Sequence, residues 1–135
     1  LKNIFLICLL TKKYKETIIL NSNSKDIGGN SYGEFFYETR SKLHKNPELA
    51  LEEYETARYI RNFLDNLEIE YEEIGTSTLA LFKGKEDLWL GFRADIDALP
   101  LQEENEVEYK SKVNGKMHAC GHDGHTTNLL YFAKG

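Results

Sequence analysis

Residues 88–100 read LWLGFRADIDALP, an alternating apolar segment that runs into two acidic residues and closes on a proline. Alternation with a period of two predicts a β-strand over residues 88–93, with neighbouring side chains on opposite faces. Another apolar segment precedes it at residues 78–83, and the polar residues 84–87 between them are typical of a tight turn. The pattern predicts two adjacent strands joined as a hairpin.

Helical patterns lie on both sides of these strands. Ser31 and Glu34 have the spacing of a capping box, and Pro47 disfavours helix before it, so a first helix should end just ahead of Pro47. A second helix should cover about residues 52–67, where apolar side chains recur every three or four positions. Helical spacing resumes from about Thr126. This order of elements predicts an α/β domain with helices packed on a sheet.

Composition excludes several classes of partner. The 135 residues carry 17 basic and 22 acidic side chains, a net charge of −5, which argues against a nucleic-acid partner. No apolar stretch approaches the roughly 20 residues that span a bilayer, so no membrane partner is expected. Two cysteines are fewer than a small secreted disulfide scaffold has, which favours a reducing, cytoplasmic location. Polar, Gly-rich residues 21–30 are typical of a linker.

Residues 117–125 read MHACGHDGH and gather three histidines, a cysteine and an aspartate, the usual ligands of transition metals. Two glycines inside this stretch and one just before it favour a loop whose backbone turns sharply. In an extended segment, Cys120 and His122 would face the same way and could hold one cation together. The stretch therefore predicts a metal-binding loop.

The acidic pair Asp95 and Asp97 follows the predicted strand, at the end where open α/β sheets place their ligand sites. Two such carboxylates can bind a cation, orient a ligand, or act as acid and base. Taken alone, the pair is equally typical of an ordinary polar strand exit. The acidic stretch with glutamates at 103, 104, 106 and 108 is interpreted as a solvated loop.

Together, RADIDALP at residues 93–100 and MHACGHDGHTT at residues 117–127 resemble the amidohydrolase branch of the aminoacylase/carboxypeptidase metallopeptidase family. That branch includes hippurate hydrolases, N-acetyldiaminopimelate deacetylases, aminobenzoyl-glutamate hydrolases and auxin-conjugate hydrolases. Upstream, RSKLHKNPEL at residues 40–49 and EYETA at residues 53–57 are similar to the family's opening helices.

The resemblance implies that residues 31–135 form the N-terminal portion of a zinc-peptidase-like catalytic domain, with helices packed on a central mixed sheet, truncated after its first metal loop. Residues 1–30 lie outside the resemblance as an extra N-terminal segment and linker. The family's catalytic glutamate and remaining metal ligands would come after Gly135, so the 135-residue chain alone is expected to be inactive as a hydrolase.

The family's roles fall on three positions. Cys120 and His122 match two ligands of its site for two divalent metals. The resemblance leaves the identity of the metal open among Zn, Mn, Co and Ni. Asp95 matches its active-site aspartate. Sister branches have a metal-binding histidine where this chain has Arg93, so Asp95 is expected to support the site while Cys120 replaces the lost ligand. Four further residues are expected to support the site or to pack: His44, Asp97, Asp123 and His125.

The implied activity is metal-dependent hydrolysis of the amide bond of N-acyl amino acids or similar small amides. In the family two metals lower the pKa of a bridging water, and a glutamate moves its proton. A small-molecule substrate is the expected partner, and a homo-oligomer is compatible with the sequence. Two alternatives stay open: a thiol hydrolase with Cys120 as nucleophile and a histidine as base, and a truncated product without enzymatic activity.

Overall fold

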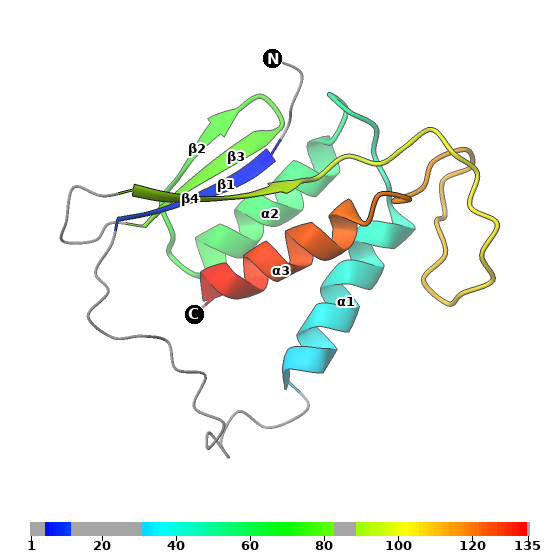
Figure 1. The fold of residues 1–135 in the computed structure, drawn as a ribbon, viewed down its shortest axis with the longest axis horizontal. Helices are drawn as coiled ribbons and strands as arrows, with labels where there is room; N and C mark the ends of the chain where they lie inside the picture. The colour runs from blue at the N-terminus through cyan, green and yellow to red at the C-terminus, as the bar shows by residue number, and fades with distance from the viewer. Residues whose placement is uncertain (1–4, 12–30, 83–88, 135) are drawn as a thin grey trace.

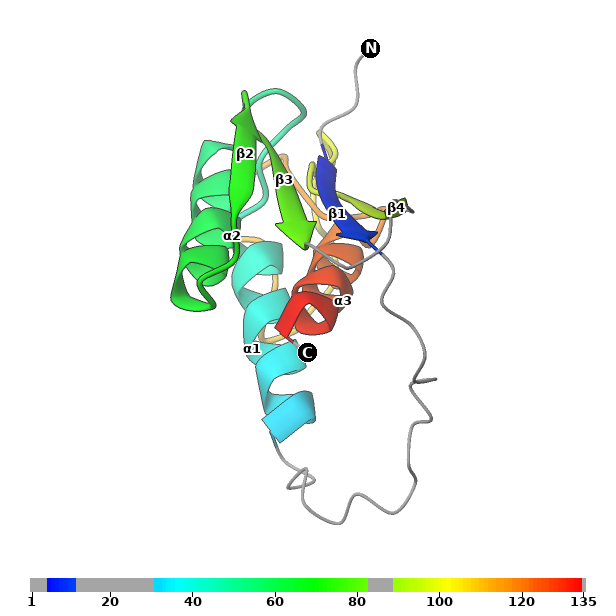
Figure 2. The same ribbon diagram turned by 90° about the vertical axis from the view of Figure 1, so that its left-hand side faces the viewer.

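A computed structural model describes residues 5–11, 31–82 and 89–134. Helices cover one face of a small mixed sheet, as expected for the α/β class (Figures 1 and 2). None of the helices in the described ranges has the length and apolar character needed to cross a membrane. The strands are β1 (Phe5–Thr11), β2 (Tyr71–Ile74), β3 (Ser77–Phe82) and β4 (Trp89–Asp95), and the helices are α1 (Ser31–Lys45), α2 (Tyr54–Asn66) and α3 (His122–Lys134).

The strand order β2-β3-β1-β4 shows that the predicted hairpin is wrong. β1 lies between β3 and β4, parallel to β3 and antiparallel to β4. Its sequence, FLICLLT, is a nearly continuous apolar run, and its pairing with both β3 and β4 makes it a central strand of the sheet. Residues 5–11 therefore belong to the sheet, although they lie outside the family resemblance. The predicted turn at residues 84–87 falls outside the described residues.

The hairpin of this sheet joins β2 to β3 instead. Gly75 makes the turn with a φ of 63°, a left-handed conformation that glycine adopts without strain. Arg61 of α2 binds this turn, donating from Nη2 to the carbonyl oxygens of Gly75 at 2.7 Å and Ser77 at 3.1 Å. The hairpin is thereby fixed to the helix beneath it.

The apolar core lies between the sheet and the helices α2 and α3 (Figure 2). The predicted apolar face of the second helix is confirmed at Ala57, Ile60 and Leu64, which are buried, while Leu67 lies at its edge. α1 packs against α3 rather than directly on the sheet (Figure 1). Five further residues of the core come from β3, β4, the residues after β4, and α3: Ala80, Ala94, Ile96, Leu129 and Leu130.

Candidate metal centre

The metal loop does not have the extended geometry that the sequence suggested for Cys120 and His122. Gly121 has a φ of 77°, so the backbone turns sharply between them. α3 begins at His122, ahead of the predicted start near Thr126. The predicted sharp loop is thus confirmed at Gly121, but the alternation argument that aligned the two side chains is wrong. His122 is oriented by the first turn of a helix.

Asp97 fixes the ring of His122. The Nδ1 atom of His122 lies 2.9 Å from the backbone oxygen of Asp97 and 3.0 Å from its carboxylate Oδ1. Both partners are acceptors, so Nδ1 carries the proton and donates it. In the neutral ring the lone pair then resides on Nε2. A carboxylate that holds one ring nitrogen while the other is left for a cation is the usual arrangement around metal-binding histidines.

Asp95 is held by the arginine two residues before it. It ends β4, and its Oδ1 accepts hydrogen bonds from Nε and Nη2 of Arg93 at 3.0 and 2.6 Å. Its backbone oxygen accepts a hydrogen bond from the Thr126 hydroxyl at 3.2 Å, which ties the strand end to α3. Asp97, two residues further on, is the acid in direct contact with His122.

Cys120 is exposed and forms no disulfide. Its place in the turn before α3 leaves the thiol accessible to a cation. Among the described residues, no three His, Cys, Asp or Glu side chains gather as a metal site. That Cys120 and His122 serve as a pair of metal ligands stays a prediction. The expectation that Cys120, His122 and Asp95 face one cavity stays a prediction.

His44 and Asp123, which the resemblance marked as supporting or packing residues, belong to a buried polar network whose third member, Glu103, the sequence did not predict. Nδ1 of His44, in the last turn of α1, lies 2.8 Å from Oδ2 of Asp123, and its Nε2 lies 3.1 Å from Oε1 of Glu103. All three side chains are buried. The interpretation of this acidic stretch as a solvated loop is wrong for Glu103, which is buried. It holds for Glu104, whose side chain is exposed. No periodicity marks Glu103, because its segment has no regular secondary structure.

Glu103 is held by several donors. Its Oε2 accepts a hydrogen bond from the Ser111 backbone at 2.6 Å, and Oε1 also contacts the amide of Asn105. Burial alone would raise the pKa of Glu103, but the hydrogen bonds from Ser111, His44 and Asn105 outweigh it and lower this pKa below its usual value. Glu103 is thus a buried carboxylate kept ionised by its partners.

His118 is buried in the same region with neither ring nitrogen hydrogen-bonded. Burial lowers the pKa of His118 to about 4, against an opposing effect of the Asp123 charge. Oδ1 of Asp123 is likewise buried without a partner. The neutral ring of His118 therefore packs beneath the loop as a largely apolar group, its centroid 6.2 Å from that of His44.

Glu53 is a second buried glutamate, and it lies near enough to Asp97 to feel its charge. Its side chain is fully buried, and its Oε2 accepts a hydrogen bond from the Thr76 hydroxyl at 2.9 Å while Oε1 has no partner. Burial raises the pKa of Glu53, and the nearby charge of Asp97 adds to this effect.

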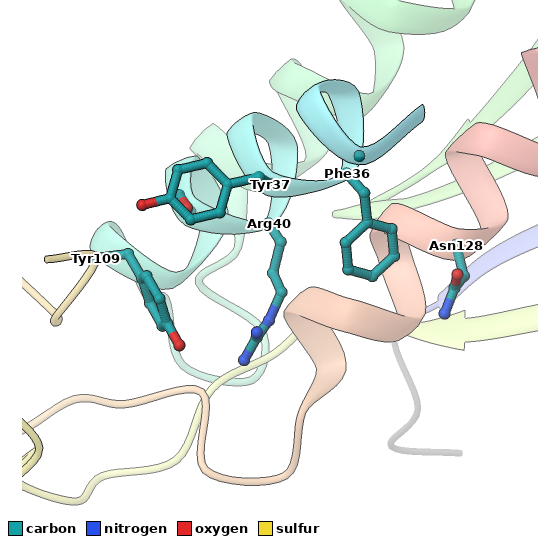
Figure 3. A pocket seen from close by; sticks show the side chains of 7 residues that line it. Phe36, Tyr37, Arg40, Tyr109 and Asn128 are labelled. Atoms are coloured by element: carbon teal, nitrogen blue, oxygen red, sulfur yellow. The ribbon is translucent and has the colours of Figure 1, made fainter. Parts of the chain in front are cut away.

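A cavity of about 310 Å³ lies between α1, α3 and the loop that carries Tyr109. Figure 3 shows Arg40 reaching from α1 into this cavity beside Tyr109. The guanidinium carbon of Arg40 lies 5.3 Å from the centroid of the Tyr109 ring. The same guanidinium donates from Nε to Oδ2 of Asp123 at 3.1 Å. The cavity thus borders the polar network, but neither Cys120 nor His122 lines it.

The sequence of the strand exit and the metal loop matches a known family. Residues 91–135, which contain Asp95, Asp97, Cys120 and His122, match the model of Peptidase family M20/M25/M40. Over these residues the chain is similar to the M20 peptidase family. The resemblance found in the sequence is thereby confirmed, as is the expected α/β fold of part of an M20 domain.

Curated relatives and solved structures agree with this assignment. A protein of Staphylococcus saprophyticus, described as an uncharacterized hydrolase, is 54% identical over 102 residues, or 75% of this chain. A Staphylococcus haemolyticus protein with the same description is 51% identical over the same length. A Bacillus subtilis protein, described as a dinuclear metal-binding peptidase of the M20 family, superposes on 78% of this chain with a TM-score of 0.69 and 36% identity. The chain spans 26% and 27% of the two relatives and 31% of the solved structure.

Proposed function

We propose that this chain carries part of the metal site of a hydrolase that cleaves the amide bond of N-acyl amino acids or similar small amides. The observation that carries the proposal is the contact between Asp97 and Nδ1 of His122, which directs the lone pair of the neutral ring to Nε2. The family match and the dinuclear metal described for the B. subtilis structure support it.

Two side chains would hold metal in this proposal: Cys120 through its thiolate and His122 through Nε2. Bound divalent metal supplies Lewis-acid chemistry, polarising an amide carbonyl and lowering the pKa of water. A thiolate and an imidazole suit Zn, with Mn, Co and Ni as alternatives, and two ions per subunit are proposed from the family pattern. A complete site needs more ligands than this pair.

Asp95 is proposed as an active-site residue in a supporting role. Arg93 is cationic and cannot bind a metal, and its guanidinium fixes the Asp95 carboxylate at the end of β4. Asp95 in turn anchors α3 through its backbone contact with Thr126. Its proposed task is to hold the strand end and the first turns of α3 together beside the metal.

The thiol-hydrolase alternative receives less support from the described contacts. A nucleophilic cysteine needs a base within hydrogen-bond reach, and no histidine in residues 31–82 or 89–134 is hydrogen-bonded to the Cys120 thiol. Nδ1 of His122 is held by Asp97 instead. Beyond the site, we propose a cytoplasmic protein with a small-molecule substrate, and a homo-oligomer remains compatible with it.

Cobalt binding to the 135-residue chain tests the proposal without requiring catalysis. We expect Co²⁺ to produce a thiolate-to-cobalt charge-transfer absorption that is lost in Cys120→Ala and weakened at least about tenfold in affinity in His122→Ala. Cys8→Ala is the matched control and should retain the absorption. Bound Co²⁺ should also protect Cys120 from iodoacetamide. Alkylation at the same rate with and without metal would instead favour a nucleophilic Cys120.

A further inference from the structure

His44 joins three separate parts of the chain at one buried point. It lies in the last turn of α1, Asp123 lies in the first turn of α3, and Glu103 lies in the irregular segment between β4 and α3. Only 4% of His44, 1% of Asp123 and 2% of Glu103 is exposed. We call these three residues the His44 bridge.

The ring of His44 lies between two buried carboxylates. Each ring nitrogen of His44 faces a carboxylate oxygen, at 2.8 Å on the Asp123 side and 3.1 Å on the Glu103 side. Both contacts are hydrogen bonds only when both nitrogens carry a proton, since ionised carboxylates only accept. Arg40 adds a second cation at Asp123. The partly exposed Arg40 thus brings positive charge to the buried carboxylate of Asp123, where an unmatched charge would be costly.

The two carboxylates of the His44 bridge lie close in sequence to His122 and Asp97, the two residues joined by the Nδ1 contact. Asp123 directly follows His122, and both belong to the first helical turn of α3. Glu103 follows Asp97 by six residues on the same irregular segment. A side chain that fixes Asp123 and Glu103 relative to each other therefore limits how far His122 and Asp97 can move apart.

We infer that His44 is a positioning residue of the metal centre, holding the first turn of α3 against the segment that carries Asp97 so that the proposed ligands are preorganised. This inference rests on the proposed metal function of Cys120 and His122. His44 acts through Asp123 and Glu103 and touches no proposed ligand. The neighbouring Tyr109 ring, edge-on to His44 at 5.4 Å, helps to keep the imidazole in place.

The test compares His44→Gln with Lys45→Gln, the same replacement one residue along α1 at a site outside the bridge. Glutamine can donate to one carboxylate only and turns an acceptor oxygen towards the other. We expect His44→Gln to weaken Co²⁺ binding about 10- to 100-fold, the range found when groups that orient metal ligands are removed. Lys45→Gln should bind Co²⁺ as the parent chain does.

A double variant and a metal-free measurement separate positioning from loss of fold. In the double variant His44→Gln/Glu103→Gln, the amide group introduced at position 103 can donate to the amide oxygen introduced at position 44. The affinity for Co²⁺ should therefore recover in part. Without metal, the backbone amide of His125, which donates to the Gly121 carbonyl at 3.1 Å, should exchange its hydrogen faster in His44→Gln only.

The outcomes distinguish the two proposals. Parent-like cobalt affinity and parent-like exchange of the His125 amide in His44→Gln would overturn the bridge and leave the proposed metal function standing. Absence of a cobalt absorption from the parent chain itself would overturn the proposed metal centre. A double variant that binds as weakly as His44→Gln, with unchanged amide exchange, would also count against the bridge.

Discussion

α3 is buried in two different ways along its length. Towards its C-terminal half, Leu130 packs into hydrocarbon contributed by α2 and the sheet, including Ile60 and Leu64. At its N-terminal end, Asp123 and Thr126 are buried as deeply, but their partners are an imidazole, a guanidinium and a backbone carbonyl. An apolar contact tolerates small shifts, whereas a buried polar group loses its partner when the geometry changes. The polar end is therefore the part suited to hold ligands at fixed positions.

The largest expected effect comes from a substitution in the apolar core that receives the C-terminal half of α3. Leu64→Ala removes a fully buried side chain and should lower the free energy of unfolding by about 2–5 kcal/mol, through lost burial and a residual cavity. Leu101→Ala, at a half-exposed leucine, is the control and should change it by less than about 0.5 kcal/mol. Urea unfolding measures both. A clear loss of Co²⁺ affinity in folded Leu64→Ala would contradict the separation of the two halves.

The sequence predicted the apolar half because burial leaves a periodic record there. Ile60 and Leu64 recur at helical spacing, and both are buried as that spacing predicts. Strand order leaves no such record. The position of β1 between β3 and β4 depends on pairing between distant segments, so an apolar run alone could not reveal it.

The polar half could be predicted by residue type but not by geometry. Cys120 and His122 stood out as ligand types with suitable spacing, yet the positive φ of Gly121 and the early start of α3 changed how their side chains are directed. Glu103 and His44 lie 59 residues apart and meet only through the fold. A glutamate in an acidic, non-periodic segment has no sequence signal that separates it from solvated neighbours.

A smaller effect should appear in how the stability of the folded chain depends on pH, through His118 in the polar region before α3. In the unfolded chain His118 takes up a proton near pH 6.5, and in the folded chain only near pH 4. As pH falls between these values, the unfolded state binds the proton first, so stability present above pH 6.5 is progressively lost. For the metal-free chain this loss amounts to at most about 3 kcal/mol.

His118→Leu should remove that part of the acid sensitivity, because leucine fills the buried site without polar atoms that need partners. Chemical denaturation of the metal-free chain at pH 7.0 and 4.5 measures the difference. His125→Gln, a change at an exposed histidine in the first turn of α3, should leave the acid loss as it is in the parent. An equal acid loss in His118→Leu would show that other groups cause it.

The smallest effect is expected at Glu53, whose buried carboxylate has one satisfied oxygen and one without a partner. Its pKa is raised in the folded chain, so folding favours its protonated form, and stability from this group is present below pH 4.5 and lost as pH rises. Glu53→Gln keeps an acceptor for Thr76 and removes the buried charge. We expect it to stabilise the chain by about 1 kcal/mol at pH 8, with no gain at pH 4.

Glu104→Gln, at an exposed acid, should show no such pH-dependent gain. Denaturation curves at the two pH values decide the point, and a gain of equal size at both would assign the effect to packing rather than to the charge beside Asp97.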